Sequence, residues 1–279
     1  IVASGCMDQL SFCISNKLVG NKVSEGALEF AYQGPLLELV GESALVAISG
    51  KVNFNIIKKN GETKQGSPNV SFLVSNGDKI DILSTIDSVY GYLSISEGFK
   101  LKEIKGSVST LVRAKIGPNN GEKLKSEDKI FFNKSSTKDK TKKIQFDFDK
   151  DNTIRVMKGL QVDYFSKKSQ EDFFSKEYKV TRLTDRMGMR LEGEKIENIV
   201  NKNIKSEGIT KGSIQIPGDG QPIILLSDHP TIGGYPKIAN VISADYDKLV
   251  QKTPGTNIKF KLVNLVVAEN AFQDYVRKF

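Results

Sequence analysis

The chain has 279 residues, of which 38% are hydrophobic and 27% charged, a composition that excludes wholesale disorder and is typical of a folded globular protein. Its length suits two domains or one large one, and such a core needs no disulfide or metal. The net charge is +8, and five of the ten residues at 134–143 are lysine. That stretch has no arginine or aromatic residue, so we interpret it as a solvated linker and expect no nucleic-acid partner.

The number of cysteines and histidines and the length of the apolar runs argue against a metal site, a disulfide scaffold and a membrane-spanning segment. The cysteines are Cys6 and Cys13, and His229 is the one histidine, so we expect neither a zinc site nor a disulfide scaffold. A Cys–His nucleophilic pair stays open on counting alone, although no flanking signature supports it. No run of 18 apolar residues and no signal-peptide pattern occurs. We therefore expect a cytoplasmic protein with no membrane partner.

The first half of the chain predicts one helix and then a series of strands. The apolar spacing in 11–20 predicts a short helix that stops at Gly20. Short apolar or alternating runs follow, separated by turn formers, which is typical of a sandwich or barrel. The predicted strands are 27–30, 36–40, 44–48, 52–57, 70–74, 80–83 and 90–95. Asn60-Gly61 predicts a hairpin turn after the fourth of them.

The second half is also rich in predicted strands. They cover 154–157, 178–181, 189–191, 213–216, 222–226, 238–243, 258–262 and 264–268. Short helices are predicted at 168–174 and 245–251, and 213–216 should form a hairpin with 222–226. The two β-rich halves meet near the lysine-rich stretch, so we expect domains at 1–140 and 141–279.

Residues 212–237 contain two polar, glycine-rich corners. The first corner, 217–222, can bring the carboxylate of Asp219 near the amides of Gln215 and Gln221. The alternative is that it is only a hairpin corner.

The second corner runs from Thr231 to Lys237. It places the glycines Gly233 and Gly234 beside Tyr235. Glycine lets a backbone approach a ligand closely, and its N–H group can bind an oxyanion. A tight turn with no ligand is the alternative.

Three further polar segments have two interpretations each. Asp185 and Arg186 precede a glycine and either orient a guanidinium toward a planar anion or form an ordinary surface ion pair. Asp8 precedes the first predicted helix, where it either caps the helix or takes part in a site. His229 is either a general base or a loop histidine without catalytic duty.

Several of these segments closely resemble the KipA-like family, whose members are also called allophanate hydrolase subunit 2, biotin-dependent carboxyltransferase or the C component of 5-oxoprolinase. The matching elements are 4–8, 18–21, 184–193, 212–237 and 241–245, with a weaker match at 159–165. The chain departs from the family pattern at His229, where the family has arginine, and it lacks the family's proline in 159–163.

The resemblance implies a mainly β fold of two tandem cyclophilin-like β-barrel domains with a few short helices. The N-terminal barrel would be 1–140, and the C-terminal barrel, 141–279, would carry the main motifs. The family's first strand and its Thr-Val-Gln-Asp-x-Gly-Arg element have no counterpart in this sequence. We therefore expect the N-terminal barrel to lack its first strand.

The resemblance also implies a function. It indicates one component of an ATP-dependent 5-oxoprolinase that opens 5-oxoproline, a small amide, to glutamate. The partners would be a KipI-like subunit (the B component of 5-oxoprolinase, or allophanate hydrolase subunit 1) and a LamB/YcsF-like third subunit. One alternative is the carboxyltransferase component of a biotin-dependent urea carboxylase/allophanate hydrolase system. Another is a non-catalytic antagonist of a kinase inhibitor.

The cofactor expectations follow from missing motifs. No Gly-x-x-x-x-Gly-Lys-Ser/Thr segment is present, so any ATP would be used through the complex. No Ala-Met-Lys-Met-like segment is present, so biotin would not be attached to this chain. We expect no metal.

Lactam opening and carboxyl transfer both develop negative charge on oxygen, which cations and N–H donors stabilise. The expected catalytic residues are Lys237, Arg186, Asp219 and Tyr235. The expected substrate-binding residues are Gln215, Gln221, Asp228, Thr231, Gly233, Gly234, Asp185 and Asp8. Asp228 is also a candidate acid or base beside Asp219.

Overall fold

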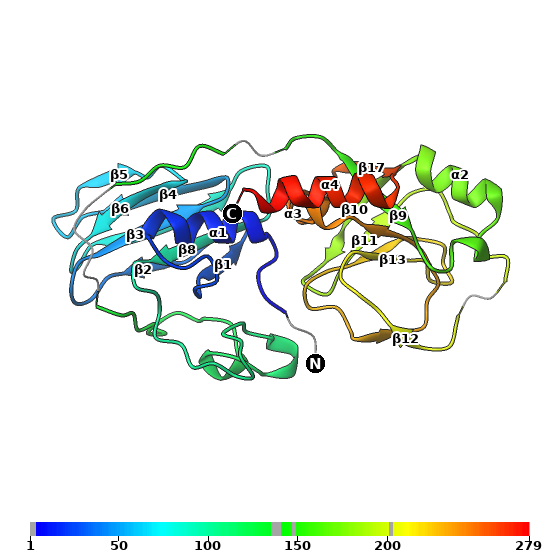
Figure 1. The fold of residues 1–279 in the computed structure, drawn as a ribbon. Coiled ribbons are helices and arrows are strands. Elements are labelled where there is room, and N and C mark those ends of the chain that lie inside the picture. The colour runs from blue at the N-terminus through cyan, green and yellow to red at the C-terminus, as the bar shows by residue number, and fades with distance from the viewer. Residues whose placement is uncertain (1–3, 135–140, 147–148, 201–202, 279) are drawn as a thin grey trace. The chain divides into compact units, whose positions relative to one another are not determined.

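A computed structural model describes residues 4–134, 141–146, 149–200 and 203–278 (Figure 1). These residues form two compact units. One, the N-terminal unit, contains residues 8–146, and the other, the barrel unit, combines residues 4–7 with 149–278. The predicted mainly β fold is confirmed. Within the described ranges, no helix combines the length and the apolar character needed to cross a bilayer.

The N-terminal unit consists of a helix and two sheets. The helix is α1 (Gln9–Val19), and the strands are β1 (Leu28–Ala31), β2 (Leu36–Glu38), β3 (Ala44–Ser49), β4 (Val52–Ile57), β5 (Thr63–Gln65), β6 (Val70–Val74), β7 (Lys79–Thr85) and β8 (Tyr90–Ile95). One sheet has the order β1-β8-β3-β6 and the other β2-β7-β4-β5, with antiparallel neighbours throughout. All seven predicted strands are present. The Asn60-Gly61 turn joins β4 to the short β5. The 3-10 turns η1 (Val112–Ala114) and η2 (Asn119–Gly121) follow the sheets.

Helix α1 begins and ends where local chemistry dictates. Asp8 is its N-cap, and its Oδ1 accepts a hydrogen bond from the Ser11 N–H at 2.9 Å. Gly20 is its C-cap in the left-handed region with φ 81°, a conformation that favours glycine. The helix packs on β3 and β8, where Ser15 Oγ lies 2.7 Å from Ser94 Oγ. The predicted helix and its stop are confirmed.

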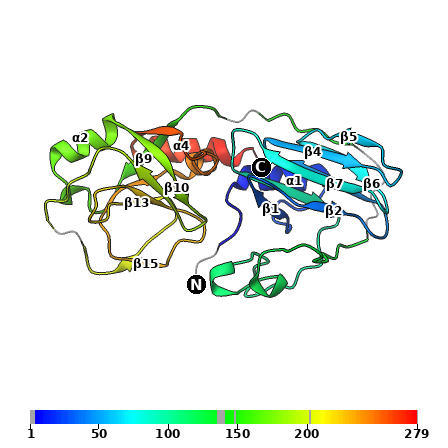
Figure 2. The ribbon, with the colours of Figure 1, turned by 180° about the vertical axis from the view of Figure 1, so that it is seen from behind.

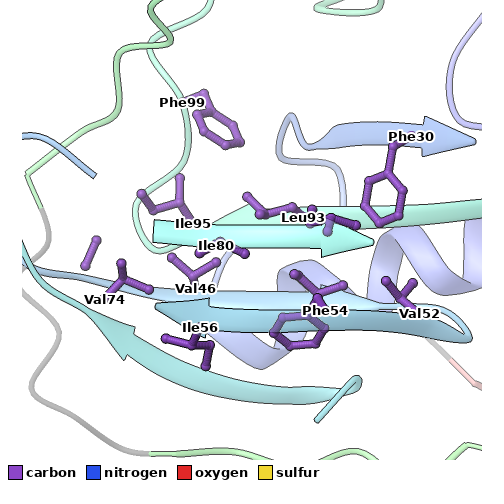
Figure 3. Packing of buried hydrophobic residues seen from close by; sticks show 13 residues of the cluster. Phe30, Val46, Val52, Phe54, Ile56, Val74, Ile80, Leu93, Ile95 and Phe99 are labelled. Carbon is purple, nitrogen blue, oxygen red and sulfur yellow. The ribbon is translucent and has the colours of Figure 1, made fainter. Parts of the chain in front are cut away.

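The core of this unit lies between its two sheets (Figure 3). Val46 and Leu93 come from one sheet, and Phe54 and Ile80 from the other, and all four are buried. Strand β4 alternates buried and half-buried residues, which is the pattern of a strand with one face against a core. Burying each such large side chain contributes about 1.5–3 kcal/mol. Here the described strands form two facing sheets, whereas in the other unit they close into a ring.

The barrel unit holds the remaining elements. They are β9 (Thr153–Lys158), η3 (Val162–Tyr164), α2 (Lys167–Ser175), β10 (Glu177–Thr184), β11 (Gly188–Glu192), β12 (Glu207–Gly208), β13 (Ser213–Gln215), β14 (Ile223–Leu225), β15 (Ile232–Gly233), β16 (Lys237–Val241), η4 (Ser243–Asp245), α3 (Tyr246–Val250), β17 (Asn257–Leu262) and α4 (Leu265–Val276). A closed barrel has the order β10-β11-β14-β13-β16-β9-β17. The pairing of β10 with β17 closes the ring. Strands β9 and β17 pair in parallel, and the other neighbours are antiparallel.

A small ribbon and a helix flank the barrel strands. Strands β12 and β15 form a separate two-stranded ribbon, which lies to one side of the barrel strands in both views (Figures 1 and 2). On the barrel itself, α2 packs on β17, where the Phe173 and Phe260 rings stack with centroids 4.6 Å apart. That aromatic contact holds α2 against β17.

One predicted strand is wrong. Residues 264–268 begin helix α4, in which Asn264 is the N-cap and accepts a hydrogen bond from the Val267 N–H at 3.0 Å. A short apolar run fits a strand or a helix equally well. Here the Asn264 cap favours the helix. Ala268 and Tyr275, seven residues apart, are the buried positions of this helix, as the helical repeat requires.

Candidate functional site

The barrel unit buries a lysine at the start of β16. The Lys237 side chain is only 5% exposed, and its Nζ donates a hydrogen bond to Oε1 of Glu207 on the ribbon strand β12. Gln161 Nε2 donates to the same carboxylate oxygen at 2.8 Å. A buried ammonium needs such a partner because desolvation of an unpaired charge is costly. The hydrogen bond from Lys237 lowers the pKa of Glu207 below its ordinary value.

The segment before η3 fixes the position of Lys237. The Lys237 N–H donates to Gln161 Oε1 at 3.2 Å, and the Gln161 N–H donates to the Lys237 carbonyl at 3.3 Å. The Gly159 N–H donates to the Ile238 carbonyl at 2.9 Å. A Cβ on Gly159 would lie 2.7 Å from the Lys237 carbonyl carbon, so only glycine fits this approach. Residues 159–161 therefore hold the backbone from which the ammonium projects.

Gln215 is the second buried polar side chain at this place. It lies opposite Lys237 in the β13–β16 ladder and is 5% exposed. Its Nε2 is buried and has no hydrogen-bond partner among the described residues. Lys237, Gln161, Glu207 and Gln215, with Gly233 beside them, are called the Lys237 cluster below.

The two glycines of the second predicted corner lie in or next to the ribbon. Gly233 is opposite Glu207 in the β12–β15 pair, and a Cβ on it would lie 2.7 Å from Gln215 Nε2. The Gly234 carbonyl accepts a hydrogen bond from the Ile204 N–H at 2.8 Å. Neither glycine has a positive φ. Close approach, rather than a left-handed turn, is therefore what requires glycine at 233.

The other residues of that corner are more exposed. Tyr235 is 40% exposed, and Thr231 is also exposed, with its carbonyl accepting a hydrogen bond from the Ile209 N–H at 3.2 Å. The structure thus brings Lys237, Gln215 and Gly233 together and places Tyr235 and Thr231 on the surface.

Arg186 and Asp228 form a second cluster in the barrel unit. Arg186 Nε donates to Asp228 Oδ2 at 2.8 Å, and Nη2 donates to Oδ1 at 3.1 Å. The same Nη2 donates to the Gly5 carbonyl at 2.5 Å, and Ser4 Oγ donates to Asp228 Oδ1 at 2.5 Å. The bidentate pair of Arg186 and Asp228 anchors residues 4–5 to the barrel. The Arg186 guanidinium, which we expected to be catalytic, makes this contact.

The remaining predicted residues hold turns. Asp185 Oδ1 accepts hydrogen bonds from the Met187 N–H at 2.8 Å and the Gly188 N–H at 3.1 Å. Asp219 Oδ1 accepts one from the Gln221 N–H at 3.1 Å, at an exposed corner. These are the local side-chain turns that aspartate favours.

Gln221 and Asp8 are occupied elsewhere. Gln221 brackets the Gly193 backbone, accepting from its N–H at 2.9 Å and donating to its carbonyl at 3.2 Å. Asp8 caps α1 in the N-terminal unit and is 2% exposed. The capping alternative for Asp8 is therefore the arrangement that the structure has.

His229 and the two cysteines are the remaining residues that the sequence analysis singled out. His229 is buried, and its Nδ1 donates to the Pro230 carbonyl at 2.6 Å. Neither Cys6 nor Cys13, both in the described part of the chain, is in a disulfide. Among the described residues, no three His, Cys, Asp or Glu side chains are grouped so as to hold a metal ion.

Sequence reasoning missed two members of the Lys237 cluster. Gln161 lies in the weakly matching element 159–165, and that element is the signal that points to it. Glu207 lies in no motif, and only the ribbon pairing of β12 with β15 brings it to Lys237.

Residues 1–262 match the family described as carboxyltransferase domain, subdomain A and B. The chain therefore belongs to this family, and the resemblance found in the motifs is confirmed. The C component of the Haemophilus influenzae 5-oxoprolinase is 31% identical over 264 residues, which are 94% of this chain and 82% of that protein. The C component of the Escherichia coli 5-oxoprolinase is 28% identical over 275 residues, covering 99% and 87%.

Solved structures agree with this assignment. The K. lactis urea amidolyase superposes with a TM-score of 0.87 at 27% identity. All of this chain is covered, but it spans only 18% of that much longer chain. The chain is therefore similar in sequence to components named for 5-oxoproline and in structure to a protein named for urea.

Proposed function

We propose that this chain is one component of an ATP-dependent 5-oxoprolinase complex that opens 5-oxoproline to glutamate. It works with a KipI-like partner and a LamB/YcsF-like third subunit. The two bacterial relatives named as 5-oxoprolinase components support the substrate, since this chain spans 82% and 87% of their lengths. The observation that carries the proposal is the buried Lys237 ammonium opposite Gln215, whose amide nitrogen has no hydrogen-bond partner in the part of the chain that the structure describes.

The Lys237 cluster suits a reaction that charges an amide oxygen. Opening a lactam adds water to its carbonyl carbon and breaks the C–N bond, and negative charge develops on the carbonyl oxygen. An ammonium has three N–H donors, and Lys237 directs one of them to Glu207. Cations and N–H groups fixed before the reaction stabilise such an oxyanion without reorganising. ATP would be used by the complex, and biotin would not be attached to this chain.

Of the two predicted cations, we assign this role to Lys237. Arg186 is held by Asp228 and by the Gly5 carbonyl, so we assign it to anchoring residues 4–5. Asp219 and Tyr235 remain candidates for the acid or base and for a further donor.

A second candidate is the carboxyltransferase component of a urea carboxylase. The TM-score of 0.87 to the K. lactis urea amidolyase favours it, and carboxyl transfer also charges oxygen atoms. A third is a binding partner that antagonises a kinase inhibitor.

Reconstitution separates the three. The chain is co-expressed with KipI-like and LamB/YcsF-like subunits, and glutamate release from 5-oxoproline is measured with and without ATP. We expect ATP-dependent glutamate only when all three chains are present. Turnover that instead requires urea and a biotin carboxylase domain would establish the second candidate. Tight binding to the KipI-like chain without any turnover would establish the third.

A further inference from the structure

Two buried side-chain polar atoms lack a hydrogen-bond partner in the described part of the chain, Tyr178 Oη and Gln215 Nε2. Leaving a buried donor unpaired costs about 1–3 kcal/mol, so such an atom needs an explanation. Tyr178 lies among the rings of Phe173 and Phe260, in aromatic surroundings. Gln215 lies beside Lys237, where a ligand oxygen is expected.

The backbone at Gly233 packs closely against the amide nitrogen of Gln215. Gly233 passes so close that a Cβ there would lie 2.7 Å from Nε2 and 2.9 Å from Ile209 Cδ1. Any other residue at 233 would therefore press on the amide. Gly208, on the partner strand of the same ribbon, has open space where its Cβ would be. The close fit is thus specific to the glycine that faces Gln215.

We propose that Gln215 is a specificity-determining residue whose Nε2–H donates a hydrogen bond to the carbonyl oxygen of a small amide, a lactam or a urea. Glycine at 233 leaves that amide group in place, since any side chain there would press on it. The choice of 5-oxoproline as first ligand rests on the proposed function, but the contact itself requires only a carbonyl oxygen. A donor reserved for substrate discriminates strongly against a ligand without the acceptor, because the donor then stays buried and unpaired.

The proposal predicts opposite effects on stability and function. Gln215→Leu removes a buried unpaired donor, so the ligand-free chain should unfold at the same or a higher temperature. In the reconstituted complex the same change should lower kcat/KM about 10- to 100-fold, because the substrate oxygen loses one hydrogen-bond donor. If Gln215 had only a structural role, Gln215→Leu would instead unfold at a lower temperature than the wild-type chain.

The glycine supplies a matched pair of variants. Gly233→Ala should lower kcat/KM because the new methyl displaces the Gln215 amide, whereas Gly208→Ala should leave it unchanged. In a Gln215→Leu background, Gly233→Ala should lower kcat/KM less than it does in the wild-type chain, because no amide remains to be displaced and only the contact with Ile209 Cδ1 stays.

The direct test is the NMR signal of the Gln215 side-chain NH2 group in the full chain, assigned by its loss in Gln215→Leu. The probes are 5-oxoproline and urea, which have the carbonyl acceptor, and proline, which has a carboxylate but no amide carbonyl. We expect the signal to shift with 5-oxoproline or urea and not with proline. No shift with either carbonyl compound, or an equal shift with proline, would overturn the inference.

The outcomes also separate this inference from the proposed function. If the complex turns over 5-oxoproline equally well with Gln215→Leu, this inference is wrong and the proposed function stands. If the complex does not turn over 5-oxoproline but urea shifts the Gln215 signal, the proposed function is wrong and the inference stands.

Discussion

Asp228 accepts three hydrogen bonds in the barrel unit, and Asp228→Asn tests what they do. The carboxylate is 9% exposed and accepts from Arg186 Nε, Arg186 Nη2 and Ser4 Oγ at 2.8, 3.1 and 2.5 Å. Asparagine keeps the shape, but its NH2 group must face one set of donors. A charge-assisted bond is lost, and the guanidinium loses the counter-charge of Asp228.

The magnitude follows from burial. Breaking a buried ion pair costs about 3–5 kcal/mol. Arg186 is 27% exposed, so water offsets part of that cost and we expect about 3 kcal/mol. For a unit of this size, that lowers the unfolding temperature by about 10 °C. Ser4→Ala removes only the hydroxyl bond and should cost about 1 kcal/mol.

Calorimetry measures the unfolding temperature, and amide hydrogen exchange at residues 5–7 measures the anchoring. We expect faster exchange there in Asp228→Asn, and a smaller increase in Ser4→Ala. Wild-type stability and exchange in Asp228→Asn would refute the anchoring role. If turnover were lost all the same, Arg186 and Asp228 would act in the chemistry, as the sequence alone suggests.

Three other variants test individual contacts within the barrel unit. Because the Lys237 hydrogen bond lowers the pKa of Glu207, the ionised carboxylate stabilises the folded chain above its unfolded pKa, and that stability is lost as pH falls through the lower folded pKa. Glu207→Gln should flatten this acid-side dependence of thermal unfolding, and an unchanged profile would contradict the pairing. Gly159→Ala should cost about 1–3 kcal/mol in urea unfolding, since its Cβ meets the Lys237 backbone, and no cost would disprove that contact. Asp245→Ala should cost about 3 kcal/mol by the same method, because it leaves Arg155 without a buried carboxylate that is 3% exposed; a cost near zero would disagree.

The elements were largely predictable because most are specified locally. Alternating apolar residues and turn formers located every strand of the N-terminal unit except the short β5, whose hairpin turn was nonetheless predicted at Asn60-Gly61. The helix α4 was missed because the apolar run of four residues at 265–268 is too short to show a helical or strand period, and the Asn264 cap was the signal that distinguished it.

Contacts between candidate residues could be predicted from the sequence where the residues share one motif. They could not be predicted where only the tertiary fold brings the residues together. Adjacency suggested that Asp185 pairs with Arg186, but Asp185 closes its own turn, and the partner of Arg186 is Asp228, 42 residues away. The hydrogen bonds from the Leu226 N–H to the Met187 carbonyl and from the Asp228 N–H to the Arg186 carbonyl, at 3.0 and 2.8 Å, bring them together. Such tertiary pairing leaves no local pattern.

The Lys237 cluster shows both cases at once. Lys237, Gln215 and Gly233 were predicted from one glycine-rich segment, and the structure gathers them. Glu207 was not predicted, because the short pairing of β12 with β15 is what carries it to the ammonium.

The role of Lys237 is tested most directly by the rate at which the reconstituted complex forms glutamate from 5-oxoproline and ATP with Lys237→Met in place of the wild-type chain. The variant removes the ammonium and keeps a long apolar side chain, and Lys237→Met with Glu207→Gln keeps the cluster neutral as a control for folding. If Lys237 stabilises the oxyanion, both variants should assemble with their partners, yet form glutamate about 100-fold more slowly or worse. Wild-type rates in an intact Lys237→Met complex would contradict that role.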